Sequence, residues 1–373
     1  MSPARRALSE AERLDWLRLI RSENVGPVTF FQLLNRFGSA AAALAALPEF
    51  ARRGGKATPL AVASKAEIER EIAALAAAGA GLVAWGEPDY PAALSTIADA
   101  PPILSLKGQR VLAAKPAIAI VGARNASGNG RRLARDLAAQ LGAAGLVVAS
   151  GLARGIDAAA HEGALATGTV AVLAGGIDMV YPAENRALHE AIAERGLLLA
   201  EMPIGTEPQA RHFPRRNRII SGCALGTVVV EAAERSGSLI TARFAAEQGR
   251  EVFAVPGSPL DPRAKGTNRL IRDGATMVES AADVLAELKP QLGRPFAESD
   301  GDGFAPPPSA EIGEKELGEA RRLVLGLLSP SPLPVDELLR QCQCSPAIVL
   351  TVILELELAG RVERQPGNTL SLR

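Results

Sequence analysis

The spacing of apolar residues changes along the chain, and each spacing predicts a different kind of structure. Between Leu14 and about Ala80, apolar residues recur every three or four positions, as in LDWLRLIRS, VTFFQLLNRF, AAALAAL and KAEIEREIAALAAAG. This period is typical of amphipathic helices. We therefore expect a small helical domain at residues 1–85.

The turn from Asn24 to Pro27 separates two of these predicted helices. Its backbone amides could face a phosphate, as in helix-hairpin-helix or SAM-like domains. It could equally be an ordinary connection between two helices, and the sequence of one short turn leaves both interpretations open.

A second spacing begins beyond Trp85. The chain is first rich in proline as far as Gly108, which predicts a connecting segment packed against the next domain. Short aliphatic runs then alternate with helix-like stretches, and these runs lie at 117–122, 146–150, 169–174, 197–201, 227–231 and 252–255. Near-continuous apolar strands about 25 residues apart predict βαβ units. We therefore expect an α/β fold at 86–290, with a central, doubly wound, mostly parallel Rossmann-like sheet.

The periodicity is lost again after Pro290. Residues 291–315 are filled with glycine, proline and acids, which predicts a flexible linker. Beyond it, EARRLVLGLLS, VDELLRQC and SPAIVLTVILELELAG predict three helices, and RVERQPGNTLSLR predicts a pair of strands. This order indicates a C-terminal winged-helix-like domain at 316–373.

Composition limits the chemistry that the chain can perform. Lysine plus arginine and aspartate plus glutamate both number 41, so any surface that binds anions must be local. Three cysteines and three histidines, without a Cys-x-x-Cys pair, predict neither a metal centre nor a disulfide framework. No stretch is typical of a signal peptide or a membrane span, so we expect a cytoplasmic protein without membrane contact.

The ends of the first two predicted strands carry residues suited to phosphate binding. Ligands of open parallel sheets bind beyond the carboxyl ends of the strands. In VGARNASGNGRR, Gly122 allows close backbone approach, Arg124 can reach an anion, and Ser127 can cap the next helix. In SGLARGIDAAAH, Gly151 precedes Arg154 in a second candidate phosphate site. Plain tight turns are the alternative explanation for the glycines, and neither run gives a clear dinucleotide-binding motif, so we expect no cofactor.

The densest cluster of charge comes later in the chain. Four arginines and no acid lie within eight residues, namely Arg211, Arg215, Arg216 and Arg218. Phe213 and Asn217 lie among them, which is unlike an ordinary solvated helix face. Arginines can hold a nucleic-acid backbone while an aromatic ring stacks on an unpaired base. This segment is therefore our leading candidate for nucleic-acid binding.

The remaining junctions are less specific. Residues 175–188, with Tyr181 and Asn185, are expected to form a locked loop that supports its neighbours. Lys265 and Asn268 occupy a loop that could also face an anion. Glu231 follows a strand, but the sequence gives it neither a nucleophile nor a metal, so we expect a structural hydrogen bond and no catalytic residue.

Seven motifs, in this order, closely resemble the DNA-processing protein A family, also called DprA or Smf. They are VGARNASGNG, SGLARGIDAAAH, GGIDMVYPAENRAL, EMPIGTEP, HFPRRNRIISG, VVVEAAERSGSLITA and VFAVPG. The resemblance is strong from about Asp89 to Ala275, fair in the N-terminal helices and weakest after Pro330. It implies a protein that binds single-stranded DNA without marked sequence preference, forms a homodimer and helps to load the RecA recombinase in natural transformation.

The resemblance also implies a DNA-binding pocket. Its residues would be Gly122, Arg124, Ser127, Gly151, Arg154, Phe213, Arg215, Asn217 and Arg218, with Lys265 and Asn268 in addition. Two residues depart from the family pattern. Ala123 stands where a serine or threonine is more usual, which removes one hydroxyl contact, and Cys223 replaces an aliphatic residue, which a small buried thiol can do without disturbance.

Two other functions remain open at this point. A Rossmann-like nucleotide phosphoribohydrolase would also place a glycine-rich turn and a glutamate after a strand, but the arginine cluster exceeds what one small phosphate requires. A winged-helix regulator of duplex DNA would depend on the C-terminal tail alone. The tail segment VDELLRQCQCSPAIVLTVILELELAG has one arginine and no lysine, which favours a protein contact or an accessory role over a grip on a duplex.

Overall fold

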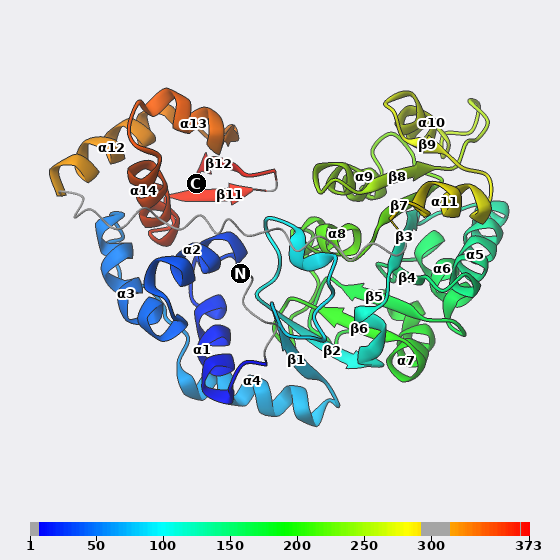
Figure 1. Ribbon diagram of the computed structural model, residues 1–373, viewed down its shortest axis with the longest axis horizontal. Coiled ribbons are helices and arrows are strands. Elements are labelled where there is room, and N and C mark those ends of the chain that lie inside the picture. Colours follow the sequence, from blue (N-terminus) through cyan, green and yellow to red (C-terminus); the bar gives the residue numbers. More distant parts are fainter. Residues whose placement is uncertain (1–6, 292–313, 366) are drawn as a thin grey trace. The chain divides into compact units, whose positions relative to one another are not determined.

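The computed structural model describes residues 7–291, 314–365 and 367–373 (Figure 1). The chain forms two compact units, one within Glu71–Glu298 and the other from Leu8–Arg70 together with Ser299–Arg373. The predicted linker at 291–315 lies almost entirely outside the described residues. The N-terminal helices and the C-terminal tail, which the sequence suggests as separate domains, thus share one unit.

The first unit is built on a single sheet. Its strands are β1 (Gly81–Ala84), β2 (Ile103–Gly108), β3 (Ala117–Gly122), β4 (Val147–Ser150), β5 (Thr169–Leu173), β6 (Leu197–Ala200), β7 (Gly226–Val230), β8 (Glu251–Ala254) and β9 (Thr276–Met277). Within the described residues the sheet has nine strands in the order β1-β2-β6-β5-β4-β3-β7-β8-β9. All six predicted strands are present, and each end lies within one residue of its predicted position. The prediction of a doubly wound, mostly parallel sheet is confirmed.

Helices cover both faces of this sheet. They are η1 (Leu94–Thr96), η2 (Arg110–Ala114), α5 (Gly128–Ala143), α6 (Ile156–Ala164), η3 (Ala183–Asn185), α7 (Arg186–Arg195), α8 (His212–Gly222), α9 (Gly237–Glu247), α10 (Lys265–Arg272) and α11 (Ala281–Leu288). Strand β3 shows how two cores arise, because its side chains alternate between faces. Ile118 and Ile120 pack with Leu137 of α5, whereas Ala119 and Val121 belong to a second core with Ile219 of α8.

One prediction about this unit was wrong. The proline-rich segment up to Gly108 is not only a connection, because it contains strand β2. Strand β2 pairs antiparallel with both β1 and β6 and so extends the sheet at one edge. The prolines next to it do not interrupt the ladder, because they precede the strand at Pro101 and Pro102.

The second unit contains the N-terminal helices and the tail. Its elements are α1 (Glu10–Arg21), α2 (Pro27–Phe37), α3 (Ala40–Arg53), the start of α4 (Lys65–Ala77) as far as Arg70, α12 (Glu314–Leu327), β10 (Leu333–Pro334), α13 (Val335–Cys342), α14 (Pro346–Leu358), β11 (Val362–Gln365) and β12 (Thr369–Leu372). Helices α12, α13 and α14 and a small antiparallel sheet, whose strand β10 lies between α12 and α13, form the predicted winged-helix arrangement. Val324, Leu338, Val352 and Leu370 meet in its core.

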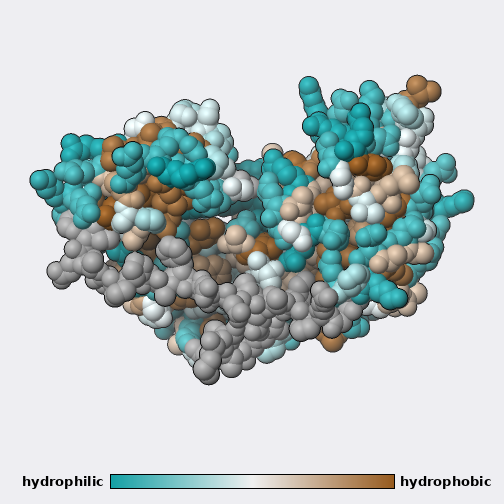
Figure 2. Space-filling view, turned by 45° about the horizontal axis from the view of Figure 1, so that its top comes forward, coloured by the Kyte–Doolittle hydropathy of each residue, from teal (hydrophilic) through white to brown (hydrophobic). Residues whose placement is uncertain are grey.

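Hydrophilic and hydrophobic residues are mixed on the face that Figure 2 shows. Where described residues are visible there, hydrophilic side chains are widespread and hydrophobic side chains form patches among them. No single helix of the described residues has the length and apolar character needed to cross a membrane; α2 and α3 meet that test only as a pair bent by 107°.

Candidate nucleic-acid interface

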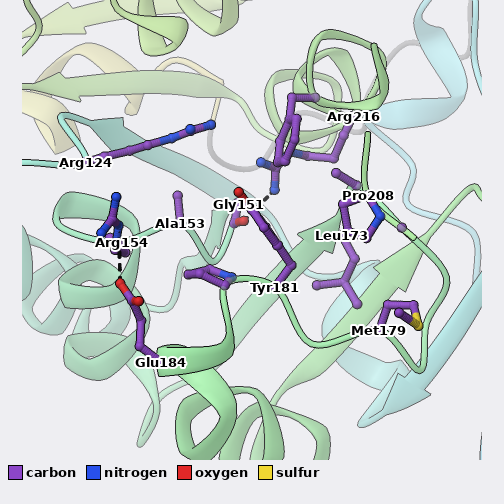
Figure 3. Close-up of a pocket in the computed structure, with 14 residues that line it drawn as sticks. Arg124, Gly151, Ala153, Arg154, Leu173, Met179, Tyr181, Glu184, Pro208 and Arg216 are labelled. Carbon is purple, nitrogen blue, oxygen red and sulfur yellow. Dashed lines mark hydrogen bonds and ion pairs between the residues drawn. The ribbon is translucent and has the colours of Figure 1, made fainter. Parts of the chain in front are cut away.

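A pocket lies at the carboxyl ends of β3, β4 and β5. Its volume is about 230 Å³. It is lined by Arg124, Gly151, Ala153, Arg154, Leu173, Ala174, Gly175, Met179, Tyr181, Pro182, Glu184, Pro208, Phe213 and Arg216. In Figure 3, Arg124 and Arg154 lie on one side, Leu173, Met179 and Pro208 on the other, and Tyr181 between them. The pocket therefore offers positive charge on one wall and apolar surface on the opposite wall.

An aromatic pair lies beside the arginines. The ring centroids of Phe213 and Tyr181 are 5.5 Å apart at an interplanar angle of 54°. The guanidinium carbons of Arg124 and Arg216 lie 5.4 Å and 5.9 Å from the Phe213 centroid. Such distances are typical of cation–π contacts. Tyr181 is 48% exposed, so part of this aromatic surface is open to a ligand.

Arg154 is held by an exposed ion pair. Its Nε lies 3.2 Å from Oε1 of Glu184, and both side chains are 55% exposed. Ion pairs between solvent-exposed side chains contribute about 0–1 kcal/mol to stability. Arg154 can therefore exchange the carboxylate for a phosphate at little cost (Figure 3).

Arg216, by contrast, is fixed. Its Nη1 donates to the carbonyl oxygens of Gly151 at 2.5 Å and Val172 at 2.6 Å, which ties α8 to the ends of two strands. Burial lowers the pKa of Arg216 to about 10, although Asp157 opposes the shift. Burial raises the pKa of Asp157, and Arg216 is the main group that opposes this. Arg216 remains charged at neutral pH and supplies a preorganised cation to the pocket wall.

The Arg216 guanidinium lies so close to Gly151 that it leaves no room for a side chain at this position. A Cβ at Gly151 would lie 2.7 Å from Cζ of Arg216, which is closer than real Cβ contacts. We expect Gly151→Ala to displace Arg216 and to lower the free energy of unfolding by about 1–3 kcal/mol, as overpacking does. Denaturant titration would measure this. Gly128→Ala is the matched control, because a Cβ there meets nothing within 4 Å. Equal stability of the two variants would contradict the expected crowding.

Ser127 and Glu231 are hydrogen-bonded to each other and do not line the pocket. The Glu231 carboxylate accepts from the backbone N of Ser127 at 2.8 Å and from its Oγ at 2.5 Å. The same Oγ accepts from the backbone N of Gly130 and caps α5. Glu231 reaches this position from a left-handed backbone, with φ of 53°. The start of α5 thus already holds an anion, which favours the structural role expected for Glu231.

The arginine cluster divides into exposed and buried members. Arg215 is exposed, whereas the Arg218 side chain is only 6% exposed. Nη2 of Arg218 donates to Glu201 at 2.5 Å, and Nη1 donates to the carbonyl oxygen of Asp99 at 2.5 Å. Asn217 is also buried, and its Nδ2 donates to the carbonyl oxygen of Gly237 at 3.4 Å. None of these three side chains lines the pocket.

The other predicted residues also lie apart from the pocket lining. Gly122 ends β3, and the exposed Lys265 begins α10. Nδ2 of Asn268 donates to the carbonyl oxygen of Gly257 at 2.8 Å, and Oδ1 of Asn268 accepts from the backbone N of Gly257 at 3.1 Å. Of the eleven predicted residues, the structure thus brings together Arg124, Gly151, Arg154 and Phe213.

Several lining residues are absent from the sequence-based site. The sequence places Arg216 in the arginine cluster without predicting that it lines the pocket, and it predicts only a supporting loop around Tyr181. That loop does support its neighbour, because Asn185 donates to the carbonyl oxygen of Leu152 at 2.9 Å. In the parts of the chain that the structure describes, no group of three His, Cys, Asp or Glu side chains could hold a metal ion.

Comparison with known proteins agrees with this architecture. The family model described as DNA recombination-mediator protein A matches residues 81–289. The chain belongs to this family. Two further models, for the DprA-like N-terminal HHH domain and the DprA winged helix domain, match residues 10–74 and 305–368. The resemblance stated from the seven motifs is confirmed, as are the types of the two smaller domains.

The chain is similar to members of this family of known sequence and structure. The DNA processing protein DprA of Bacillus subtilis is 44% identical over 225 residues, which are 60% of this chain and 76% of that protein. The X-ray structure of DNA processing protein A from Streptococcus pneumoniae aligns with a TM-score of 0.62 at 37% identity, covering 76% of this chain and 99% of that one. The structure of the Helicobacter pylori protein, described for its single-stranded DNA binding mode, aligns with a TM-score of 0.52 at 27% identity, covering 57% and 96%.

Proposed function

We propose that this protein binds single-stranded DNA at the pocket formed by β3, β4, β5 and α8. The observation that carries the proposal is the pairing of three guanidinium groups with the Phe213–Tyr181 aromatic pair in one hollow. Arginines neutralise backbone phosphates, and aromatic rings stack on unpaired bases of any sequence. The single-stranded DNA binding mode described for the Helicobacter pylori relative supports the same ligand here.

Selectivity for single strands follows from the shape of the pocket. A base can reach the apolar wall beside Leu173 and Met179 only if it leaves its stack. Paired bases would first have to separate, which costs a few kcal/mol. Among the four predicted residues that the pocket unites, we assign phosphate contacts to Arg124 and Arg154 and base stacking to Phe213.

The proposed role is a binding role without catalysis. The rival, a nucleotide phosphoribohydrolase, needs a free acid near the substrate, but the Glu231 carboxylate is engaged by Ser127. One pocket covers few nucleotides, so useful affinity requires two or more pockets on one strand, as in a homodimer. Family membership supports the finer proposal that the bound dimer loads RecA in natural transformation, in the cytoplasm.

Fluorescence anisotropy with labelled oligonucleotides tests the proposal. We expect tight, salt-dependent binding of single strands and weak binding of duplexes. Arg124→Ala and Arg154→Ala should each weaken binding and reduce the slope of log K against log salt by about 0.7, the value for one single-strand phosphate. Arg243→Ala is the control, because this exposed arginine is not part of the pocket lining. Equal binding of duplex and single strand, or turnover of a nucleoside monophosphate, would overturn the proposal.

A further inference from the structure

Helix α14, the third helix of the winged-helix domain, is buried on more than one side. Val349, Val352, Ile353 and Leu356 pack into the core of its own domain. Leu354 and Leu358 are not members of that core, yet they are 3% and 0% exposed. Another part of the chain must therefore cover them.

The N-terminal helices provide that cover. Nη1 of Arg36 in α2 donates to Oγ1 of Thr351 at 2.8 Å. Oγ1 of Thr29, also in α2, donates to Oε2 of Glu357 at 3.2 Å. The Asn24 side chain donates to the carbonyl oxygen of Leu358 at 3.1 Å. The turn that the sequence offered as a phosphate site thus contacts the end of α14.

Gly54 allows the closest approach between the two parts. A Cβ at this position would lie 2.6 Å from the carbonyl carbon of Glu355 and 2.8 Å from Cβ of Ala359. Its φ of −67° is open to any residue, so the need for glycine here comes from the contact and not from the backbone.

The charges on α14 are unsuited to DNA. The helix contains Glu355 and Glu357 but no lysine or arginine. Both carboxylates are buried and paired, Glu355 with Arg321 at 2.5 Å and Glu357 with Arg364 at 2.7 Å. Helices that read duplex DNA lie in the major groove and contact base edges and phosphates. Helix α14 itself offers no cationic side chain to a phosphate, and its two acids are taken up by arginines of its own domain.

We propose that α14 is a protein-docking face and that its partner is the α2–α3 region of the same chain. The winged-helix domain then serves as an intramolecular cover for the N-terminal helices and does not bind duplex DNA through its third helix. This inference is independent of the pocket described above, because it depends on residues of the other compact unit.

Hydroxyl-radical footprinting of the full-length chain tests the docking. Leu354 and Leu358 should be protected in the wild type. Gly54→Leu should raise their labelling by roughly tenfold, because buried side chains react only in an opened population. Gly318→Leu is the matched control, because a Cβ there meets nothing within 4 Å. Labelling of Leu354 and Leu358 in the wild type, or unchanged protection in Gly54→Leu, would overturn the proposal.

Two further readouts separate this proposal from its rivals. Protection should be the same at low and high protein concentration, whereas loss of protection on dilution would assign the partner to a second copy of the chain. Duplex binding by Gly54→Leu should remain as weak as that of the wild type. A gain of duplex binding would mean that docking hides a DNA-reading helix, and the assignment of α14 as a protein-docking face would be wrong.

Discussion

Arg218→Ala should lower the free energy of unfolding by about 3–5 kcal/mol, the usual effect of removing one partner from a buried ion pair. The Arg218 guanidinium contacts two acids, Glu201 at 2.5 Å and Asp99 at 3.5 Å. Burial alone would lower the pKa of Arg218, but the charges of Glu201 and Asp99 raise it above its usual value. Without the arginine, the Glu201 carboxylate, only 18% exposed, loses the guanidinium that now lies against it.

Arg215→Ala is the matched control for this variant. Arg215 lies three residues earlier in α8, is exposed, and should change stability by no more than about 0.5 kcal/mol. Thermal and denaturant unfolding would compare the two. If Arg218→Ala proved as stable as the wild type but lost DNA binding, the side chain would have to leave its acids to contact DNA, contrary to the role assigned here.

Phe213→Ala should weaken the binding of single-stranded DNA by about 1–3 kcal/mol for each base that stacks on the ring. The reason is that Phe213 lines the pocket beside Tyr181 and two guanidinium groups, so a planar base that enters the pocket can lie against this aromatic pair. Anisotropy at one fixed salt concentration would measure the loss. Because the substitution leaves the charges unchanged, the salt dependence should stay that of the wild type.

Phe213→Trp separates stacking from a general disturbance of the pocket. Tryptophan keeps an aromatic face, so we expect affinity within a few-fold of the wild type or better. If Phe213→Trp bound as poorly as Phe213→Ala, the ring would be filling space, and the proposed stacking would be wrong. Unfolding measurements on both variants would show whether either loss has a cause in stability.

The parallel strands could be predicted because each is a short, nearly continuous apolar run between helical stretches. Strands β1 and β2 were not, because β1 is a four-residue edge strand directly after a helix, β2 lies in a proline-rich context, and the pairing of β2 with β6 joins residues about a hundred positions apart. Such pairing depends on tertiary contacts that local composition does not contain.

The arginine cluster shows the same limit for the site. Arg215, Arg216 and Arg218 look alike in the sequence, but α8 turns the first toward solvent and the other two into the protein. Arg216 and Arg218 differ in their neighbours. Arg216 contacts the carbonyl oxygens of Gly151 and Val172. Arg218 contacts the acids Asp99 and Glu201. Those neighbours come from other strands and loops, so the helical period alone could not identify which arginine reaches the pocket.

The contact between Asn24 and Leu358 joins residues 334 positions apart in the chain. A ribosome adds about 5–20 residues each second, so the N-terminal helices emerge roughly 15–70 s before α14 is complete. During that interval the surface that α14 covers is open to solvent and to other nascent chains. The packing of α14 against the first helices therefore cannot form until nearly the whole chain has been made, which places it among the last events of folding.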